Sequence, residues 1–444
     1  MLAQLVQSAC FTRMRSLVRI QYVPPKPRLV RGLSFLGLRW RSEGRNDVHL
    51  RTMPREQRPL IAIIVLLVAA AMALEIANGR FWLNDFRVYY SASHALLHSK
   101  QVYGIPFGED TGFFKYAPMV VIAFVPFALL PYGLAAGIHF ALIGVALVIA
   151  FARIERLLMR HVFGNYAPRI LLRGGLALLC VAVLLSRELH LGNINLWLVV
   201  GVVFATEALL EGDDGVAGLL FGLLWLTKPY LAFMAVPLVV ALRWKTLRNA
   251  GITIASGLLL PVLFVGPHRW LLLHRAWLDA MAAHSGYLTS PDTFISLASG
   301  YFRSVSTCQH PNVVIPITGI AFGALCWWRR KRSGEDDRTL TLQIWTAFAL
   351  VPHLVITDQE HFLYSLPLIA LTLAALFYQR RPLALVLFIA AMLLYATRSS
   401  DLWGSQLESR LVANGALGIG NLLLLLAAWS PDRRPLPSKE VLNP

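Results

Sequence analysis

Charged residues are scarce in this sequence: Asp, Glu, Lys and Arg make up 15% of the 444 residues, whereas 57% are hydrophobic. A soluble chain carries about 25% charged residues, so the composition excludes an ordinary soluble enzyme. The high apolar content also excludes a disordered protein. Short segments of alternating polarity, which are typical of a transmembrane barrel, are missing as well.

Cysteines and soluble-enzyme motifs are equally rare. The four cysteines are scattered and no two form a CxxC pair, so they indicate neither a disulfide framework nor a metal site. The sequence contains no Walker A motif, no GxSxG, no HExxH and no Rossmann fingerprint. We therefore expect chemistry that uses no metal site and no cofactor recognisable from the sequence.

Long apolar runs are what the sequence does contain. About ten of them reach or approach the ~17–25 residues that a helix needs to cross a bilayer. They predict an all-α polytopic integral membrane protein with about 10–13 transmembrane or re-entrant helices. The predicted spans are 60–79, 134–152, 170–186, 194–211, 250–266, 313–328, 340–355, 364–378, 382–397 and 414–429.

Two further apolar segments do not fit a simple crossing. Residues 117–131 are short and contain three prolines, and residues 216–242 carry Lys228-Pro229 midway. Irregular backbone is tolerated at membrane depth only where it is buried in protein or faces a watery cavity. We expect both segments to be short, broken or re-entrant elements beside a cavity.

More than half of the net charge of +17 lies in residues 1–59, which contribute +9, and the remainder lies mostly in short basic clusters between the spans. Basic loops usually lie on the cytoplasmic side, and nucleic-acid binding would need a basic soluble domain. This rule places two long loops, 80–116 and 267–312, on the outer side. The sequence thus predicts a multi-pass protein of the inner (plasma) membrane whose active site faces the periplasm or the exterior.

The first 52 residues differ from the rest in being Arg-rich and free of acids before Glu43. They are compatible with a transit peptide, with a disordered tail, or with a natural start at Met53. We favour a start at Met53, because a short basic leader before the first span is a common arrangement. A single transmembrane domain then covers 53–435, followed by a cytoplasmic tail at 436–444.

Asp85 is the first acid after the first span, and Trp82 and Phe86 flank it. Apolar surroundings raise the pKa of a carboxyl group and suit a general base. An interfacial aspartate that caps the following helix explains the same pattern. Glu109 and Asp110 lie among glycines and predict an exposed turn.

Polar residues in apolar stretches supply further candidates. Burying the charge of Lys228 inside a membrane costs free energy, so Lys228 marks a functional site, with a phosphate as its natural partner. The alternative is that its side chain extends to the interface. Asn193 and Asn195 begin a predicted span, where capping and substrate contact are both plausible. His361 lies among polar neighbours on the predicted outer side, and Asp292 belongs to the second outer loop.

Several of these residues form a pattern that resembles glycosyltransferase family 87. The pattern comprises Asp85, Tyr89-Tyr90, Leu97, Tyr103, the string Phe114-Lys115-Tyr116-Ala117-Pro118, Gly192-Asn193-Ile194-Asn195, Gly218, Gly222 and Lys228-Pro229. The likeness covers about residues 60–380, and Asn193 departs from it because the family typically has Gln at that position.

The resemblance implies a GT-C-like fold and a specific chemistry. It implies transfer of a sugar, often mannose, from a polyprenyl-phosphate donor to a lipid or glycan acceptor, in contact with membrane lipids. The catalytic acid of the family maps onto Asp85. Substrate-binding residues are then expected at Lys228, Lys115, Tyr89, Tyr90, Tyr116, Asn195 and His361. A transporter or flippase of lipid-linked sugars remains the alternative, and a non-catalytic scaffold for envelope assembly is a third possibility.

Overall fold

The computed structural model describes residues 57–108, 112–164, 169–284, 290–294, 296–297, 311–334, 336–354, 358–379 and 381–430. All of them belong to one compact unit, Arg51–Pro444. Within these ranges the backbone is helical or irregular, and the only β contact is an isolated antiparallel bridge between Pro106 and Phe113. The described part of the chain is therefore all-α, as the sequence predicts.

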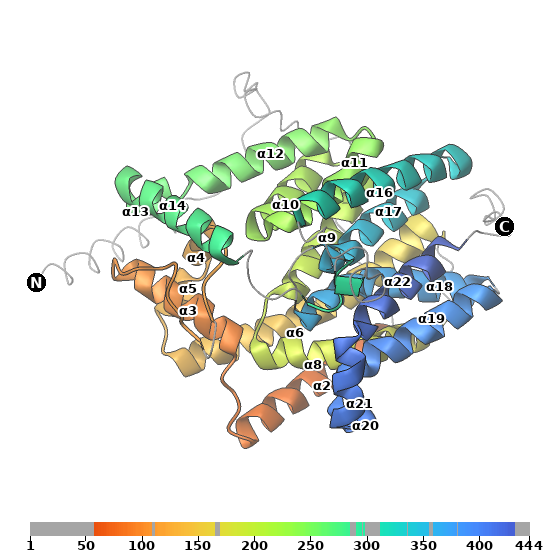
Figure 1. Cartoon of the computed structure of the whole chain (residues 1–444), viewed down its shortest axis with the longest axis horizontal. Coiled ribbons are helices and arrows are strands. Elements are labelled where there is room, and N and C mark those ends of the chain that lie inside the picture. Colours follow the sequence, from red (N-terminus) through yellow and green to blue (C-terminus); the bar gives the residue numbers. More distant parts are fainter. Residues whose placement is uncertain are drawn as a thin grey trace, which may run out of the picture. The chain divides into compact units, whose positions relative to one another are not determined.

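Figure 1 shows how the described helices follow one another along the chain. The first half contains α2 (Arg58–Ala77), α3 (Asn84–Leu97), α4 (Pro118–Ala123), α5 (Val125–Ala128), α6 (Tyr132–Leu157), η2 (Leu158–Val162), α7 (Ile170–Cys180), α8 (Ala182–Leu191), α9 (Asn195–Leu210) and α10 (Asp214–Thr227). The middle contains η3 (Pro229–Met234), α11 (Ala235–Val240), α12 (Trp244–Leu259), α13 (Val262–Val265), α14 (Pro267–His284) and α16 (Pro311–Ser333). The last part contains α17 (Asp337–Leu350), η5 (Val351–His353), η6 (Gln359–Ser365), α18 (Leu366–Tyr378), α19 (Pro382–Tyr395), η7 (Ala396–Arg398), α20 (Ser400–Trp403), α21 (Ser405–Ala413) and α22 (Ala416–Trp429).

Four helical segments in the described part are long and apolar enough to cross a membrane: Arg58–Ala77, Tyr132–Val162, Trp244–Val265 and Gln359–Tyr378. Two bent pairs, α7 with α8 and α21 with α22, bring the number to six if each pair is one span. Large apolar side chains of α2, such as Leu66 and Leu74, are 68% and 63% exposed. A hydrophobic surface of this extent suits contact with lipid. These features confirm the predicted polytopic membrane fold.

The two irregular segments are broken as expected. Residues 117–131 form only the short helices α4 and α5, because Pro118 begins the first, Pro126 lies at the start of the second, and Pro131 precedes α6. A proline fits the first turn of a helix but interrupts a helix interior. The second break falls at Lys228, which has an extended backbone between α10 and η3.

Two glycines of α10 determine how this second segment runs. A Cβ atom on Gly218 would lie 2.5 Å from the Cβ of Asn249, and one on Gly222 would lie 2.5 Å from the Cβ of Thr253. The contacts advance in the same direction along both helices, so α10 and α12 pack in parallel and very close together (Figure 1). The chain between them must consequently reverse direction after Lys228, so Lys228 lies at the turning point between α10 and η3.

One predicted span is longer and more bent than expected. The sequence predicts a single crossing at 170–186, whereas the structure has α7 and α8 meeting at an angle of 64° around Val181. The second helix continues to Leu191, and α9 begins at Asn195 after a short turn. This turn lies at the candidate site.

Candidate functional site

Asp85 lies in the first turn of α3, shortly after α2 ends. Its side chain is half-buried, and its Oδ2 accepts a hydrogen bond of 2.6 Å from Nδ2 of Asn193. The N-cap of α3 is Leu83 in a left-handed conformation, and no side chain caps the helix. The carboxylate therefore does not cap α3, although a negative charge in the first turn suits the helix dipole.

Gly192 brings Asn193 close to Asp85. It ends α8 with a φ of 67°, in the left-handed region that glycine adopts without strain. A Cβ atom at this position would lie 2.9 Å from the Cβ of Leu83 and 3.0 Å from the Cβ of Phe86. The turn between α8 and α9 can thus touch the start of α3 only because residue 192 has no side chain.

Two tyrosines complete the surroundings of Asn193. The hydroxyl of Tyr89 donates to Oδ1 of Asn193 at 3.2 Å and lies 3.1 Å from the hydroxyl of Tyr116. The neighbouring Tyr90 points elsewhere, because its hydroxyl donates to the carbonyl of Leu130 at 2.8 Å. The structure thus gathers Asp85, Tyr89 and Tyr116 around Asn193 and leaves Tyr90 outside this group.

Lys228 is 4% exposed and forms the second half of the site. Its ammonium donates to Oδ1 of Asn195 at 2.8 Å and to the hydroxyl of Tyr364 at 3.1 Å. The rings of Tyr116, Tyr230 and Tyr364 surround it, with centroids 5.8–5.9 Å from Nζ. Aromatic faces at this distance stabilise a cation, so the site favours positive charge.

Asn195 is held in place by a buried acid. Glu188 is fully buried, and its carboxylate accepts from Nδ2 of Asn195 at 2.9 Å and from the backbone N–H of Leu196 at 3.1 Å. The hydroxyl of Tyr364 also donates to Oδ1 of Asn195, at 2.9 Å. The amide is therefore fixed with its oxygen toward Lys228 and its nitrogen toward Glu188.

His361 approaches Lys228 from the start of η6. Its Nδ1 accepts the backbone N–H of Asp358 at 3.0 Å as part of a capping box, so a neutral ring carries its hydrogen on Nε2. Nε2 lies 2.9 Å from Nζ of Lys228 and 3.3 Å from the hydroxyl of Tyr230. Two nitrogen donors thus lie side by side, an arrangement that the oxygen atoms of an anion would stabilise.

The charges of both halves act on Asp85. Its pKa is raised to about 7, mainly by burial and further by the charges of Glu360 and Asp358, against the opposing charges of Lys228 and Lys115. Burial lowers the pKa of the half-buried Lys115, which the charges of Asp358 and Asp85 oppose. A carboxyl group with a pKa near neutrality can accept a proton at physiological pH.

Several residues of this site are missed when the sequence is considered alone. The fold brings to the site Glu188, Tyr230, Tyr364 and a salt bridge of 3.0 Å between Arg187 and buried Glu360. Glu188 alone had a signal, since an acid lies close to the Gly192-Asn195 turn. Glu109 and Asp110 lie outside the described residues, as do the leader 1–52 and the tail 436–444.

Among the described residues, no group of three His, Cys, Asp or Glu side chains could hold a metal ion. The arrangement instead combines a carboxylate of raised pKa with a cation held among tyrosines. It can accept a proton at one end and stabilise an anionic group at the other.

Comparison with known proteins supplies a family. The profile of glycosyltransferase family 87 matches residues 113–357, which include Lys115, Asn193 and Lys228, and which exclude Asp85 and His361. No curated protein and no solved structure matches the chain. Because the matched residues make up more than half of the chain, and because the fold is that of a polytopic membrane protein, this chain belongs to glycosyltransferase family 87.

Proposed function

We propose that this glycosyltransferase moves a sugar, with mannose as the leading candidate, from a polyprenyl-phosphate donor to a lipid or glycan acceptor. The observation that supports this proposal best is that one site contains both Asp85, whose pKa is raised to about 7, and the buried ammonium of Lys228. A base and a cation are the two groups that such a transfer needs.

In the proposed reaction, Asp85 takes the proton from the acceptor hydroxyl as its oxygen attacks the anomeric carbon of the sugar. The bond between that carbon and the phosphate oxygen breaks, and polyprenyl phosphate leaves with the electron pair. The growing negative charge on the phosphate is stabilised by cationic groups, for which Lys228 and Lys115 are the candidates. Nε2–H of His361 and the hydroxyl of Tyr230 offer neutral donors beside Lys228.

Tyr89, Tyr116 and Asn195 have positioning roles in this scheme. Asn193 orients Asp85 through its 2.6 Å hydrogen bond, and Tyr89 orients Asn193. Asn195 directs the ammonium of Lys228. Tyr90 donates to the carbonyl of Leu130, outside the group around Asn193, and its part in substrate binding stays a prediction.

We place the reaction at the outer face of the plasma membrane. Nucleotide sugars are cytoplasmic, whereas a flipped lipid-linked donor is available outside. The basic clusters between the predicted spans favour the same orientation. The site lies at the turning point at Lys228, where broken helices bring polar groups to membrane depth.

Asp85→Asn is the test, because it keeps the shape of the side chain and removes the base. We expect normal insertion and melting, retained donor binding, and a loss of transfer of about 10²-fold or more. The assay measures release of polyprenyl phosphate from a labelled polyprenyl-phosphate sugar in nanodiscs. Asp279→Asn, an exposed position on α14, serves as the matched control.

The same assay separates the enzyme from the alternative. A flippase of lipid-linked sugars would move the donor between leaflets without releasing polyprenyl phosphate. Near-normal turnover of Asp85→Asn would refute the assigned base. Donor translocation without product would favour the flippase.

A further inference from the structure

His139, on α6, has an imidazole that lies among three phenylalanine rings. The residue is 3% exposed, and its ring stacks on that of Phe86 with centroids 4.3 Å apart and an angle of 15° between the planes. The rings of Phe124 and Phe127 approach it at 5.9 and 5.8 Å. The imidazole therefore has a fixed orientation in apolar surroundings.

This orientation directs one ring nitrogen at the backbone of a turn. Nε2 of His139 lies 2.9 Å from the carbonyl oxygen of Gly192, the residue that ends α8. A carbonyl oxygen can only accept, so Nε2 carries a hydrogen and donates it. Apolar surroundings strengthen such a bond, which holds the turn between α8 and α9 against α6.

The two contacts of His139 involve the chain neighbours of a hydrogen-bonded pair. Phe86 follows Asp85, and Gly192 precedes Asn193, whose Nδ2 donates to Oδ2 of Asp85 at 2.6 Å. His139 thus contacts one neighbour of each partner. A shift of either neighbour would change the distance between the amide and the carboxylate.

Other bonds of Asn193 have a different effect. Its Oδ1 accepts from the hydroxyl of Tyr89 at 3.2 Å and from the backbone N–H of Ile194 at 2.7 Å. Those bonds set the rotation of the amide, whereas the bond from His139 sets the position of the backbone that carries it.

The lysine half of the site is held by separate contacts. Glu188 accepts from Nδ2 of Asn195, and Oδ1 of Asn195 accepts from Lys228. Loss of the bond from His139 should therefore affect Asp85 more than Lys228.

We propose that His139 is a positioning residue for the transfer reaction, because it holds the turn at Gly192 so that the amide of Asn193 stays on the carboxylate of Asp85. It acts through Asn193 and not on the reacting atoms. This inference rests on the proposed role of Asp85 as the general base.

The proposal has a consequence for the acidity of Asp85. A hydrogen bond from Asn193 favours the ionised carboxylate, so a looser contact should raise the pKa of Asp85. The other charges that act on Asp85 are those of Glu360, Asp358, Lys228 and Lys115, and a substitution of His139 changes none of them.

Two variants separate the ring of His139 from its hydrogen bond. His139→Phe keeps an aromatic ring on Phe86 and removes the donor, whereas His139→Gln keeps an N–H donor and removes the ring. In His139→Phe the midpoint of the pH–rate profile should move up by about half a pH unit, and kcat near neutral pH should fall roughly threefold to tenfold. The Kd for polyprenyl phosphate should stay unchanged, and His139→Gln should lie closer to the wild type.

A double-mutant cycle tests the route through Asn193. In the Asn193→Ala background, His139→Phe should move the midpoint no further, because the amide that His139 positions is already gone. Infrared titration of the Asp85 carboxyl band, assigned by its loss in Asp85→Asn, measures the same pKa without turnover.

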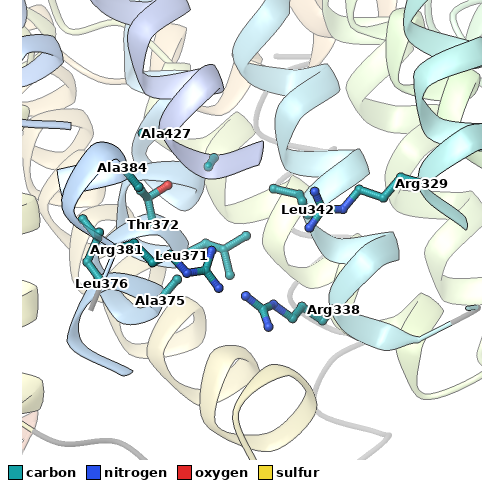
Figure 2. Close-up of a pocket in the computed structure, with 11 residues that line it drawn as sticks. Arg329, Arg338, Leu342, Leu371, Thr372, Ala375, Leu376, Arg381, Ala384 and Ala427 are labelled. Carbon is teal, nitrogen blue, oxygen red and sulfur yellow. The ribbon is translucent and has the colours of Figure 1, made fainter. Parts of the chain in front are cut away.

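Two positions outside the group around Asn193 serve as controls for lost stability. His353 is a second buried histidine, stacked on Phe294 at 4.6 Å, with Nδ1 3.0 Å from the carbonyl oxygen of Asp292. Thr372, which lines a small cavity near the end of α18 (Figure 2), donates to the carbonyl of Leu368 at 2.7 Å. His353→Phe and Thr372→Val should lower the melting temperature and leave the midpoint unmoved.

An unmoved midpoint in His139→Phe, with transfer lost in Asp85→Asn, would overturn the positioning role and leave the proposed function intact. Near-normal turnover of Asp85→Asn would refute the proposed function instead, and the infrared titration would still test the contact. Equal shifts with and without Asn193, or a shift of the same size in a control, would also overturn the positioning role. If His139→Phe does not fold, the smaller His139→Leu, which also lacks the donor, supplies the same comparison.

Discussion

Lys228→Met replaces the buried ammonium with an apolar side chain of similar length. The change removes the hydrogen bonds to Asn195 and Tyr364. It leaves Asn195 with hydrogen-bond partners, because Oδ1 of Asn195 still accepts from Tyr364 and its Nδ2 still donates to Glu188. We therefore expect the fold to persist while the cation for the donor phosphate is lost.

The magnitudes differ enough to separate the two effects. Each hydrogen bond of a charged group contributes about 1.5–3 kcal/mol to stability. Burying the ammonium costs several kcal/mol, which methionine recovers, so the net change in unfolding free energy should stay within about 2 kcal/mol. Removing one partner of a buried charge pair costs about 2–5 kcal/mol of binding, which corresponds to a Kd for polyprenyl phosphate roughly 30-fold to several thousand-fold higher.

The assay measures binding of polyprenyl phosphate to the protein in nanodiscs, together with a melting curve. Lys245→Met serves as the control, since Lys245 is an exposed lysine at the start of α12 and the charge change is identical. Unchanged donor affinity in Lys228→Met would refute the assignment of Lys228 to the phosphate. A collapse of the melting curve in that variant would show that Lys228 is needed for folding.

Four further predictions concern the pH dependence, the partner of Asp85, helix packing and the leader. Because the folded-state pKa of Asp85 is raised to about 7, kcat/KM should increase with pH up to about 7, and a flat pH–rate profile would contradict the role of a base. The contribution of this group to stability should decline as pH rises through the same value, which melting curves check. Asn193→Ala removes a donor to the ionised carboxylate and should move the profile to higher pH, whereas an unmoved midpoint would argue against this coupling. Gly222→Val places atoms about where Thr253 lies and should destabilise the protein by about 1–3 kcal/mol, as seen by melting, so a neutral result would contradict the close packing of α10 and α12. A chain begun at Met53 should insert and transfer sugar normally, and loss of either on expression would show that 1–52 are required.

Much of the fold could be predicted because apolar run length is a strong signal for membrane helices. The predicted span 60–79 corresponds to α2, and the prolines correctly indicated the breaks at 117–131 and at Lys228. The bend at Val181 could not be predicted, since no proline or glycine marks it in the sequence. The parallel packing of α10 against α12 likewise depends on which residues the two helices present to each other.

The candidate site was only partly predictable, for a different reason. A charge in an apolar stretch is visible in the sequence, which is why Asp85 and Lys228 were singled out. Their partners are not visible, because Tyr364 lies 136 residues from Lys228 and Asn193 lies 108 residues from Asp85 along the chain. Adjacent positions of a helix also face different directions, so the pattern could not tell Tyr89 from Tyr90.

The same limit applies to Asp292, which the sequence placed among the polar residues of an outer loop. Its side chain is fully buried, pairs with Arg398 and accepts from the backbone N–H of Gly418 at 2.9 Å. His353 lies 3.0 Å from its carbonyl oxygen through Nδ1. These contacts tie the segment to α22 and η7, so Asp292 has a structural role.

The orientation of the His361 ring links donor binding to proton uptake. With Nδ1 occupied by the N–H of Asp358, both Nε2 of His361 and the ammonium of Lys228 present hydrogens to each other across 2.9 Å. Without an anion beside them, this repulsion makes the ammonium of Lys228 lose a proton more readily, because its free amine can then accept Nε2–H of His361. An arriving phosphate makes both protons favourable again, so the protein should take up a proton from the buffer as it binds the donor. Calorimetric binding enthalpies should consequently differ between buffers of different ionisation enthalpy, and equal enthalpies would show that the pair keeps both protons throughout.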